Sequence, residues 1–148
     1  MKLSSTFAAV ALVLLAATSV GCAPSVYSKD SGIKELLKSS KDIARGRGFR
    51  KTLAQGSGQL NNRQMSITPV DLKAGRSYLI VGLCEAACSD LDLEVFDGEG
   101  FVLAGDTLDD EIPLFELNPD QDGRFPIGAR MIVCDREPCA FAFGVYGK

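Results

Sequence analysis

Four cysteines in two close pairs are the residues of this chain with the clearest capacity for chemistry. Cys84 is followed by Cys88, and Cys134 is followed by Cys139. Four cysteines allow three connectivities, and the spacing favours a bond within each pair because export delivers nearby cysteines together. Each bond would close a small loop and constrain the unfolded chain by about 2–3 kcal/mol. The sequence therefore predicts two turns stapled by local disulfides.

Two other uses of these cysteines stay open on the sequence alone. Four thiolates could hold zinc, but the close C-x-x-C spacing typical of such sites is absent, and an oxidising compartment favours disulfides. A redox-active dithiol is also normally a C-x-x-C pair, and neither pair has that form.

Carboxylates form the second group with chemical potential. They lie in the strand-like segment Ser89–Asp97, where alternation places Asp90 and Asp92 on the face opposite Leu91. Calcium takes about six to eight oxygen ligands, which acidic loops beside a strand can supply. The predicted calcium ligands, all acids of this strand or of the segment that follows it, are Asp90, Asp92, Asp106 and Asp109. A solvated acidic surface is the alternative.

Catalytic groups are poorly represented. The chain contains no histidine, which removes the base of a Ser-His or Cys-His relay. Gly56-Ser57-Gly58 is expected in a glycine-rich loop and lacks the strand–turn–helix context of a nucleophile elbow. No pair of carboxylates has a spacing that singles it out for glycosidic chemistry. The chain is therefore predicted not to be an enzyme.

The N-terminus has the features of an export signal. Residues 1–21 combine a positively charged start, an apolar run from Phe7 to Ala17 and a small-residue region. The ending Ser19-Val-Gly-Cys22 resembles a bacterial lipobox, in which Cys22 is acylated and becomes the mature N-terminus. Acylation would also account for the odd fifth cysteine. We therefore expect an outer-membrane lipoprotein held in the lipid bilayer through Cys22 or, alternatively, a soluble secreted protein.

Charge is unevenly distributed along the chain. Residues 24–51 hold eight basic and three acidic residues, whereas residues 52–148 hold seven basic and sixteen acidic residues. A basic arm can face a membrane or nucleic acid, and the predicted export argues against nucleic acid. A solvated helix face beside an acidic domain explains the pattern equally well.

The periodicity of apolar residues divides the chain into a helix and a β domain. After a tether at residues 22–30, helical spacing predicts an amphipathic helix over residues 31–48. From residue 49 to 148 the pattern alternates, with turn residues every 8–12 positions or so, which predicts an all-β antiparallel sandwich or jelly roll of seven or eight strands. Strands are expected near residues 59–60, 65–67, 78–81, 90–97, 101–104, 112–117, 125–133 and 141–145.

Strand parity also predicts where aromatic residues lie. Phe141 and Phe143 alternate as core residues. Tyr146 has the opposite parity and is predicted to be exposed. Phe96 has the parity of the acids in its strand, and we expect the N-terminal helix to cover it.

The order of several motifs resembles a known family. Leu72-Lys-Ala-Gly-Arg-Ser-Tyr78 is followed by the acidic segment Ser89–Asp97, then by Gly105-Asp-Thr107 and Gly123-Arg-Phe125. This order resembles the bacterial pre-peptidase C-terminal (PPC) type of domain over most of the mature chain. The resemblance implies a jelly-roll-like sandwich, and some members of that family bind calcium.

Two functions follow as expectations. The first is a non-enzymatic binding or structural module of the cell envelope with a protein, peptide or glycan partner. The alternative is a calcium-dependent carbohydrate- or peptide-binding accessory domain of a secreted enzyme system. Dependence on calcium separates the two.

Overall fold

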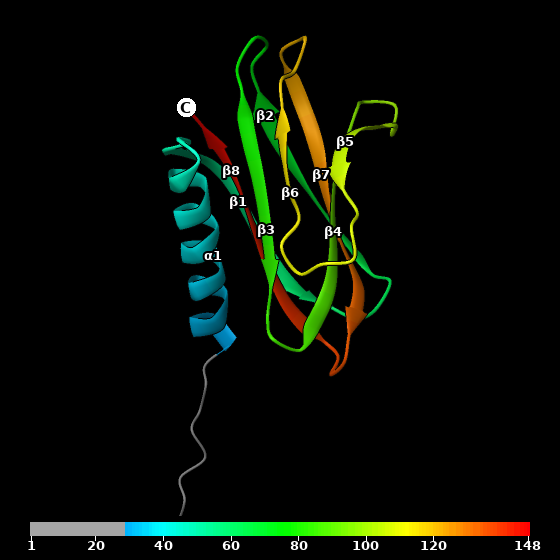
Figure 1. The fold of residues 1–148 in the computed structure, drawn as a ribbon. Coiled ribbons are helices and arrows are strands. Elements are labelled where there is room, and N and C mark those ends of the chain that lie inside the picture. Colours follow the sequence, from blue (N-terminus) through cyan, green and yellow to red (C-terminus); the bar gives the residue numbers. More distant parts are fainter. Residues whose placement is uncertain (1–28) are drawn as a thin grey trace, which may run out of the picture.

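A computed structural model describes residues 29–148, which form one helix and eight strands (Figure 1). The helix α1 spans Lys29–Gly46. The strands are β1 (Lys51–Leu60), β2 (Met65–Leu72), β3 (Tyr78–Cys84), β4 (Cys88–Phe96), β5 (Val102–Asp106), β6 (Leu114–Leu117), β7 (Gly123–Cys134) and β8 (Cys139–Gly147). The predicted signal peptide, Cys22 and most of the tether lie outside the described residues.

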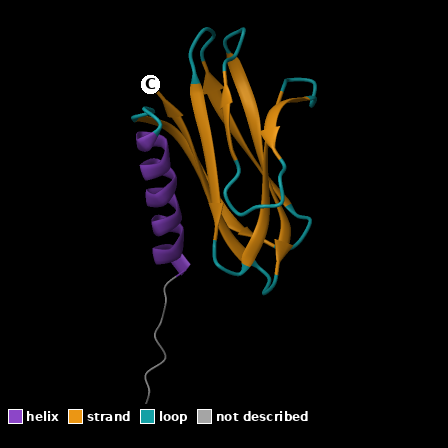
Figure 2. Cartoon of the chain, in the orientation of Figure 1, coloured by secondary structure: helices purple, strands orange, loops and turns teal. Residues whose placement is uncertain are grey.

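The strands form two antiparallel sheets, and α1 lies outside one of them (Figure 2). Sheet A has the order β1-β8-β3-β6, and sheet B has the order β2-β7-β4-β5. The first strand pairs with the last, the second with the seventh, the third with the sixth and the fourth with the fifth. This is the pairing of a jelly roll, with the β4–β5 hairpin as the tip of a folded ribbon. The predicted all-β sandwich of eight strands with an N-terminal helix is confirmed.

Two apolar clusters explain why most strands alternate, whereas β3 and β8 are buried on both faces. The main core lies between the sheets and includes Phe141 and Phe143, as predicted. In β3, Ile80 faces this core, whereas Leu79 and Val81 belong to a second cluster beneath α1. Since both faces of β3 are covered, its sequence is apolar at almost every position.

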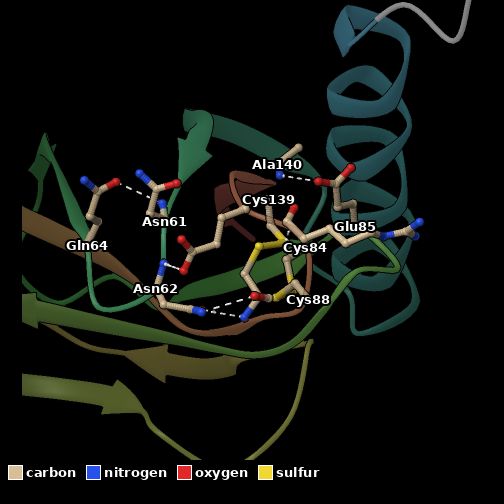
Figure 3. The surroundings of a disulfide bond; sticks show 11 residues. Asn61, Asn62, Gln64, Cys84, Glu85, Cys88, Cys139 and Ala140 are labelled. Atoms are coloured by element: carbon tan, nitrogen blue, oxygen red, sulfur yellow. Dashed lines mark hydrogen bonds between the residues drawn. A yellow bond between two sulfur atoms is a disulfide. The ribbon is translucent and has the colours of Figure 1, made fainter.

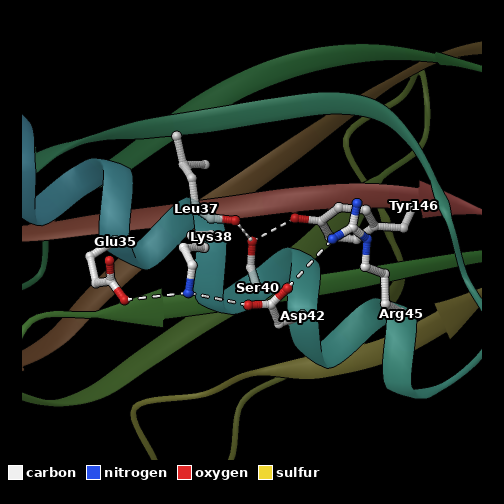
Figure 4. A network of polar contacts seen from close by, with 7 residues as sticks. All are labelled: Glu35, Leu37, Lys38, Ser40, Asp42, Arg45 and Tyr146. Carbon is white, nitrogen blue, oxygen red and sulfur yellow. Dashed lines mark hydrogen bonds and ion pairs between the residues drawn. The ribbon is translucent and has the colours of Figure 1, made fainter.

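The second cluster joins α1 to the outer face of sheet A. Ala44, Phe49 and Tyr146 pack there and are at most 1% exposed. The Ser40 hydroxyl donates to the Leu37 carbonyl at 3.0 Å, and its oxygen lies 2.5 Å from the Tyr146 hydroxyl (Figure 4). Either hydroxyl can be the donor in this pair. No helix in residues 29–148 is long and apolar enough to cross a membrane.

Two predictions about aromatic residues are wrong, and the position of α1 explains both. Tyr146 does point away from the main core, but α1 covers that face of β8, so its exposure is 0%. Phe96 belongs to β4 of sheet B and is only partly buried. It lies beside Met65 and Ile67 on that sheet, whereas α1 packs on sheet A.

The expected glycine-rich loop at Gly56-Ser57-Gly58 is part of β1 instead. Gly56 is opposite Phe143 and Gly58 is opposite Phe141 on β8. A Cβ atom at Gly56 would lie 2.2 Å from the Phe143 ring, and one at Gly58 would lie 3.2 Å from the Phe141 ring. The glycines therefore make room for two core rings, and this requirement overrides their low preference for strands.

The β3–β4 and β7–β8 turns, which carry the two disulfides, lie at the end of the sandwich where α1 begins (Figure 1). Cys84 is bonded to Cys88 and Cys134 to Cys139, which is the local pairing that the spacing favours. All four of these cysteines are at most 8% exposed. With both pairs oxidised, no thiolate remains among them for zinc or for dithiol chemistry.

Side-chain hydrogen bonds hold three turns together around these disulfides (Figure 3). The Ala140 amide donates to the Glu85 carboxylate at 2.8 Å, and the Glu85 amide donates to the Ala140 carbonyl at 3.0 Å. The Cys134 amide donates to the Asn62 side-chain oxygen at 2.6 Å, while the Asn62 side-chain nitrogen donates to the Cys134 carbonyl at 3.1 Å. Two disulfides and these hydrogen bonds thus connect the three turns at this end of the domain.

Candidate functional site

Five exposed apolar side chains come from one continuous segment at the edge of sheet B. We call them the hairpin surface: Phe101 (66% exposed), Val102 (53%), Leu103 (49%), Leu108 (69%) and Ile112 (40%). The segment comprises β5, the end of the β4–β5 turn and the loop that leads to β6. Edge strands normally carry charge or proline that discourages pairing, so this apolar edge is a candidate interaction surface.

A β-bulge explains why two consecutive side chains of β5 are exposed. Val95 is opposite Ala104 and Phe96 is opposite Val102, which leaves Leu103 as the extra residue. Ala104 packs against the main core. A bulge bends the strand and changes the direction of its side chains. Here it lets both Val102 and Leu103 face solvent.

The turn before this strand is fixed by Asp97. Its carboxylate accepts hydrogen bonds from the amides of Phe101 at 2.8 Å and Glu99 at 2.9 Å. The Asp97 amide also donates to the Phe101 carbonyl at 2.9 Å. The backbone that carries the exposed Phe101 ring is therefore fixed by hydrogen bonds.

Hollows lie on both sides of the hairpin. On the outer face of sheet B, a shallow hollow of about 540 Å³ lies between the turn at residues 97–100 and the side chains of Met65, Ile67, Phe96, Pro126 and Arg130. On the other side, Leu103 borders a smaller hollow of about 200 Å³ with Leu117 and the loop at residues 118–121. Concave apolar sites that flank an exposed aromatic group are typical of binding surfaces.

The stretch of sequence that contains the hairpin surface carries negatively charged side chains only. Residues 77–123 contain thirteen acidic residues and no lysine or arginine. Within the segment itself, Asp106 and Asp110 fold back on the backbone: Asp106 accepts from the Leu114 amide at 2.9 Å, and Asp110 accepts from the Ile112 amide at 2.9 Å. The apolar strip therefore has a mainly acidic border, with Arg130 as the basic residue of the adjoining hollow.

The four predicted calcium ligands have different environments. Asp90 is 7% exposed, and its Oδ1 has no hydrogen-bond partner. Asp106 is occupied by loop amides, Asp109 is exposed, and Asp92 is opposite Arg130 of β7. Among residues 29–148, no three histidine, cysteine, aspartate or glutamate side chains are grouped so as to hold a metal ion.

Burial and like charge perturb two of these carboxyl groups. Burial raises the pKa of Asp90, and the neighbouring Asp109 and Asp110 raise it further. Burial, followed by the charges of Asp90 and Glu94, raises the pKa of Asp92 to about 6, although Arg130 opposes the shift. Because its pKa is raised in the folded state, ionised Asp92 disfavours folding.

Substituting D92N is therefore expected to stabilise the protein at neutral pH. Between about pH 4 and pH 6 the folded state keeps a proton that the unfolded state has lost, so wild-type stability falls as pH rises through this window. Above pH 7, D92N should raise the free energy of unfolding by about 1–2 kcal/mol, allowing for solvent screening. Urea unfolding at pH 4 and pH 7.5 measures this, and the gain should vanish at pH 4.

The control for D92N is D120N, which removes the same charge from an exposed loop position. It should leave the difference in stability between the two pH values close to that of the wild type. An equal gain from D92N at both pH values would contradict the assigned effect of the Asp92 charge.

The comparisons with known proteins show no family for this chain. A scan against models of protein families finds no match, and a search of curated proteins finds none either. Among solved structures, the chain is similar to PliG of Aeromonas hydrophila, a periplasmic lysozyme inhibitor of g-type lysozyme. The match has 14% identity and a TM-score of 0.47 and covers 64% of this chain and 85% of PliG. Similarity at this level does not show what this chain binds.

Proposed function

We propose that this chain is an exported, non-enzymatic β-sandwich that binds a positively charged protein through the hairpin surface. The exposed apolar strip on the edge strand β5 carries the proposal. Its acidic border complements a basic partner and would steer it during encounter. The exposed groups are predominantly aliphatic, with Phe101 as the single aromatic group, which favours an apolar protein loop over a glycan as the occupant.

Export is supported by chemistry in the described residues and by the sequence before them. Two buried disulfides suit an oxidising compartment. Acylation of Cys22, which would add the lipid bilayer as a partner, remains our prediction from the lipobox. Intact-mass measurement of the native protein tests it, since a mass equal to the unmodified chain from Cys22 onward would contradict acylation.

Photo-crosslinking in the native host tests the proposed partner. A benzoylphenylalanine placed at Leu108 should give a covalent adduct with a basic envelope protein, because this side chain is 69% exposed at the centre of the acidic segment. The same group at Val133, which is 39% exposed at the disulfide end, is the control. Identical adducts from the two positions, or an acidic partner, would contradict the proposal.

The calcium-dependent accessory domain is the second candidate, and the unpartnered Oδ1 of Asp90 favours it. A cation beside Asp90 would satisfy this oxygen and relieve repulsion from Asp109 and Asp110. If calcium binds, the melting temperature should rise by several degrees between chelator and millimolar calcium. D90N should abolish the rise. Identical melting curves in chelator and in calcium would contradict this second candidate function.

A further inference from the structure

A separate pocket lies at the opposite edge of the sandwich, between the start of β1 and the β2–β3 turn. It has a volume of about 380 Å³, within the range of small-ligand sites. Strands β1 and β2 are the edge strands on this side, whereas β5 and β6 are the edges next to the hairpin surface. The pocket is therefore independent of the surface proposed above to bind protein.

Positive charge dominates the lining of this pocket. Four basic residues line it, Lys51, Lys73, Arg76 and Lys148, against one acidic residue, Asp71. Among the ion pairs of residues 29–148, only Lys73 of these four takes part, with Asp122 at 2.9 Å. The hydrogen bond from Lys73 holds the pKa of Asp122 below its usual range, aided by the Ala74 amide.

The other three basic residues, Lys51, Arg76 and Lys148, form no ion pair with a carboxylate among residues 29–148. Lys148 extends its ammonium group over the Phe49 ring, 5.0 Å from the centroid. Lys51 and Arg76 are exposed to solvent at the pocket. Cations that line a concave site without an ion pair favour an anionic ligand, and a guanidinium can hold a phosphate through two parallel hydrogen bonds.

The backbone that carries these cations is fixed. The Lys73 amide donates to the hydroxyl of the buried Tyr78 at 2.9 Å. Gly75, with a φ of 68°, donates its amide to the Pro119 carbonyl at 3.0 Å. This turn fixes the backbone next to Arg76 before a ligand binds, which lowers the cost of ordering the loop. Leu53, 39% exposed, supplies an apolar wall.

We propose that this pocket binds a phosphate group, with Lys51 and Arg76 as its cationic partners. A doubly charged phosphate matches several unpaired cations better than a singly charged carboxylate does. The apolar wall at Leu53 accommodates the organic part of a phosphate ester. The phosphate can belong to a soluble ester or to a lipid head group, and the two are distinguished by experiment.

Titration followed by ¹H–¹⁵N NMR at low salt tests the site with inorganic phosphate, and co-sedimentation tests it with phosphatidylcholine vesicles that contain phosphatidic acid. Phosphate should shift the amide signals of Lys51, Arg76 and Ser77 in particular. The double variant K51Q/R76Q should weaken binding at least about tenfold, since each charge-assisted contact is strong. The control K34Q/R136Q removes the same two charge types from exposed positions elsewhere and should bind like the wild type.

Each outcome decides for or against the pocket. Binding of free phosphate that K51Q/R76Q weakens supports a soluble ester, and vesicle binding alone with the same dependence supports a lipid phosphate. The proposal would be overturned if K51Q/R76Q and K34Q/R136Q bound phosphate equally well. It would also be overturned if the wild type bound acetate, tested as a singly charged comparison anion, as tightly as phosphate, or if it bound neither phosphate nor the vesicles. The dispersion of the NMR spectrum verifies that each variant is folded.

Discussion

Replacing Phe49 by alanine is expected to lower the free energy of unfolding by about 3–5 kcal/mol. Phe49 is 1% exposed and packs with Leu79, Val81 and Tyr146 at the junction between α1 and sheet A. Its amide donates to the Ala44 carbonyl at 3.0 Å, which ties the end of the helix to the start of the sandwich. The loss is a large share of the stability of a domain of this size.

Urea unfolding of F49A measures this loss, and F101A is the matched control. Both substitutions remove a phenyl ring, but Phe101 is 66% exposed, so F101A should change stability by less than about 0.5 kcal/mol. Equal effects of F49A and F101A would mean that α1 is not part of the folded core.

Removing both disulfides is expected to lower the free energy of unfolding by about 4 kcal/mol, or about 2 kcal/mol for each bond. The estimate follows from their sequence separations of 4 and 5, since small loops constrain the unfolded chain only modestly. Urea unfolding of the oxidised protein and of a variant with all four cysteines replaced by alanine measures the difference.

Two controls separate the bonds from the side chains. A reducing agent should lower the stability of the wild type and leave the cysteine-free variant unchanged. Peptide mapping without reduction should recover Cys84 linked to Cys88 and Cys134 linked to Cys139. Peptides that link the first pair to the second would contradict the connectivity.

The fold was largely predictable because alternation dominates the strands that cover only one core. In β7, Phe125, Ile127 and Met131 face the main core at every second or fourth position, so the sequence shows the strand directly. The full extent of β1 was not predictable. Gly56 and Gly58 disfavour a strand locally, and the reason for them, the rings of Phe143 and Phe141, lies more than eighty residues away.

The face of a strand on which a residue lies was easier to predict from the sequence than whether that face is buried. Tyr146 has the parity expected, yet its exposure depended on which sheet α1 covers. The apolar run Phe101-Val-Leu103 is visible in the sequence, but it resembles any buried strand until the topology places β5 at an edge. The burial of Asp90 was also not predictable from the sequence. Register shifts on both sides of Asp90 interrupt the pairing of β4 with β7, so the inward and outward alternation of side chains does not hold there.

The hairpin surface is tested most directly by the affinity of purified variants for the basic partner captured through Leu108. The substitution pair F101S/L108S removes the two most exposed apolar groups, whereas L53S/V133S removes two exposed apolar groups outside the hairpin surface. We predict that F101S/L108S weakens binding about a hundredfold and that L53S/V133S binds like the wild type. Wild-type affinity of F101S/L108S, with the control unchanged, would contradict the claim that this surface binds protein.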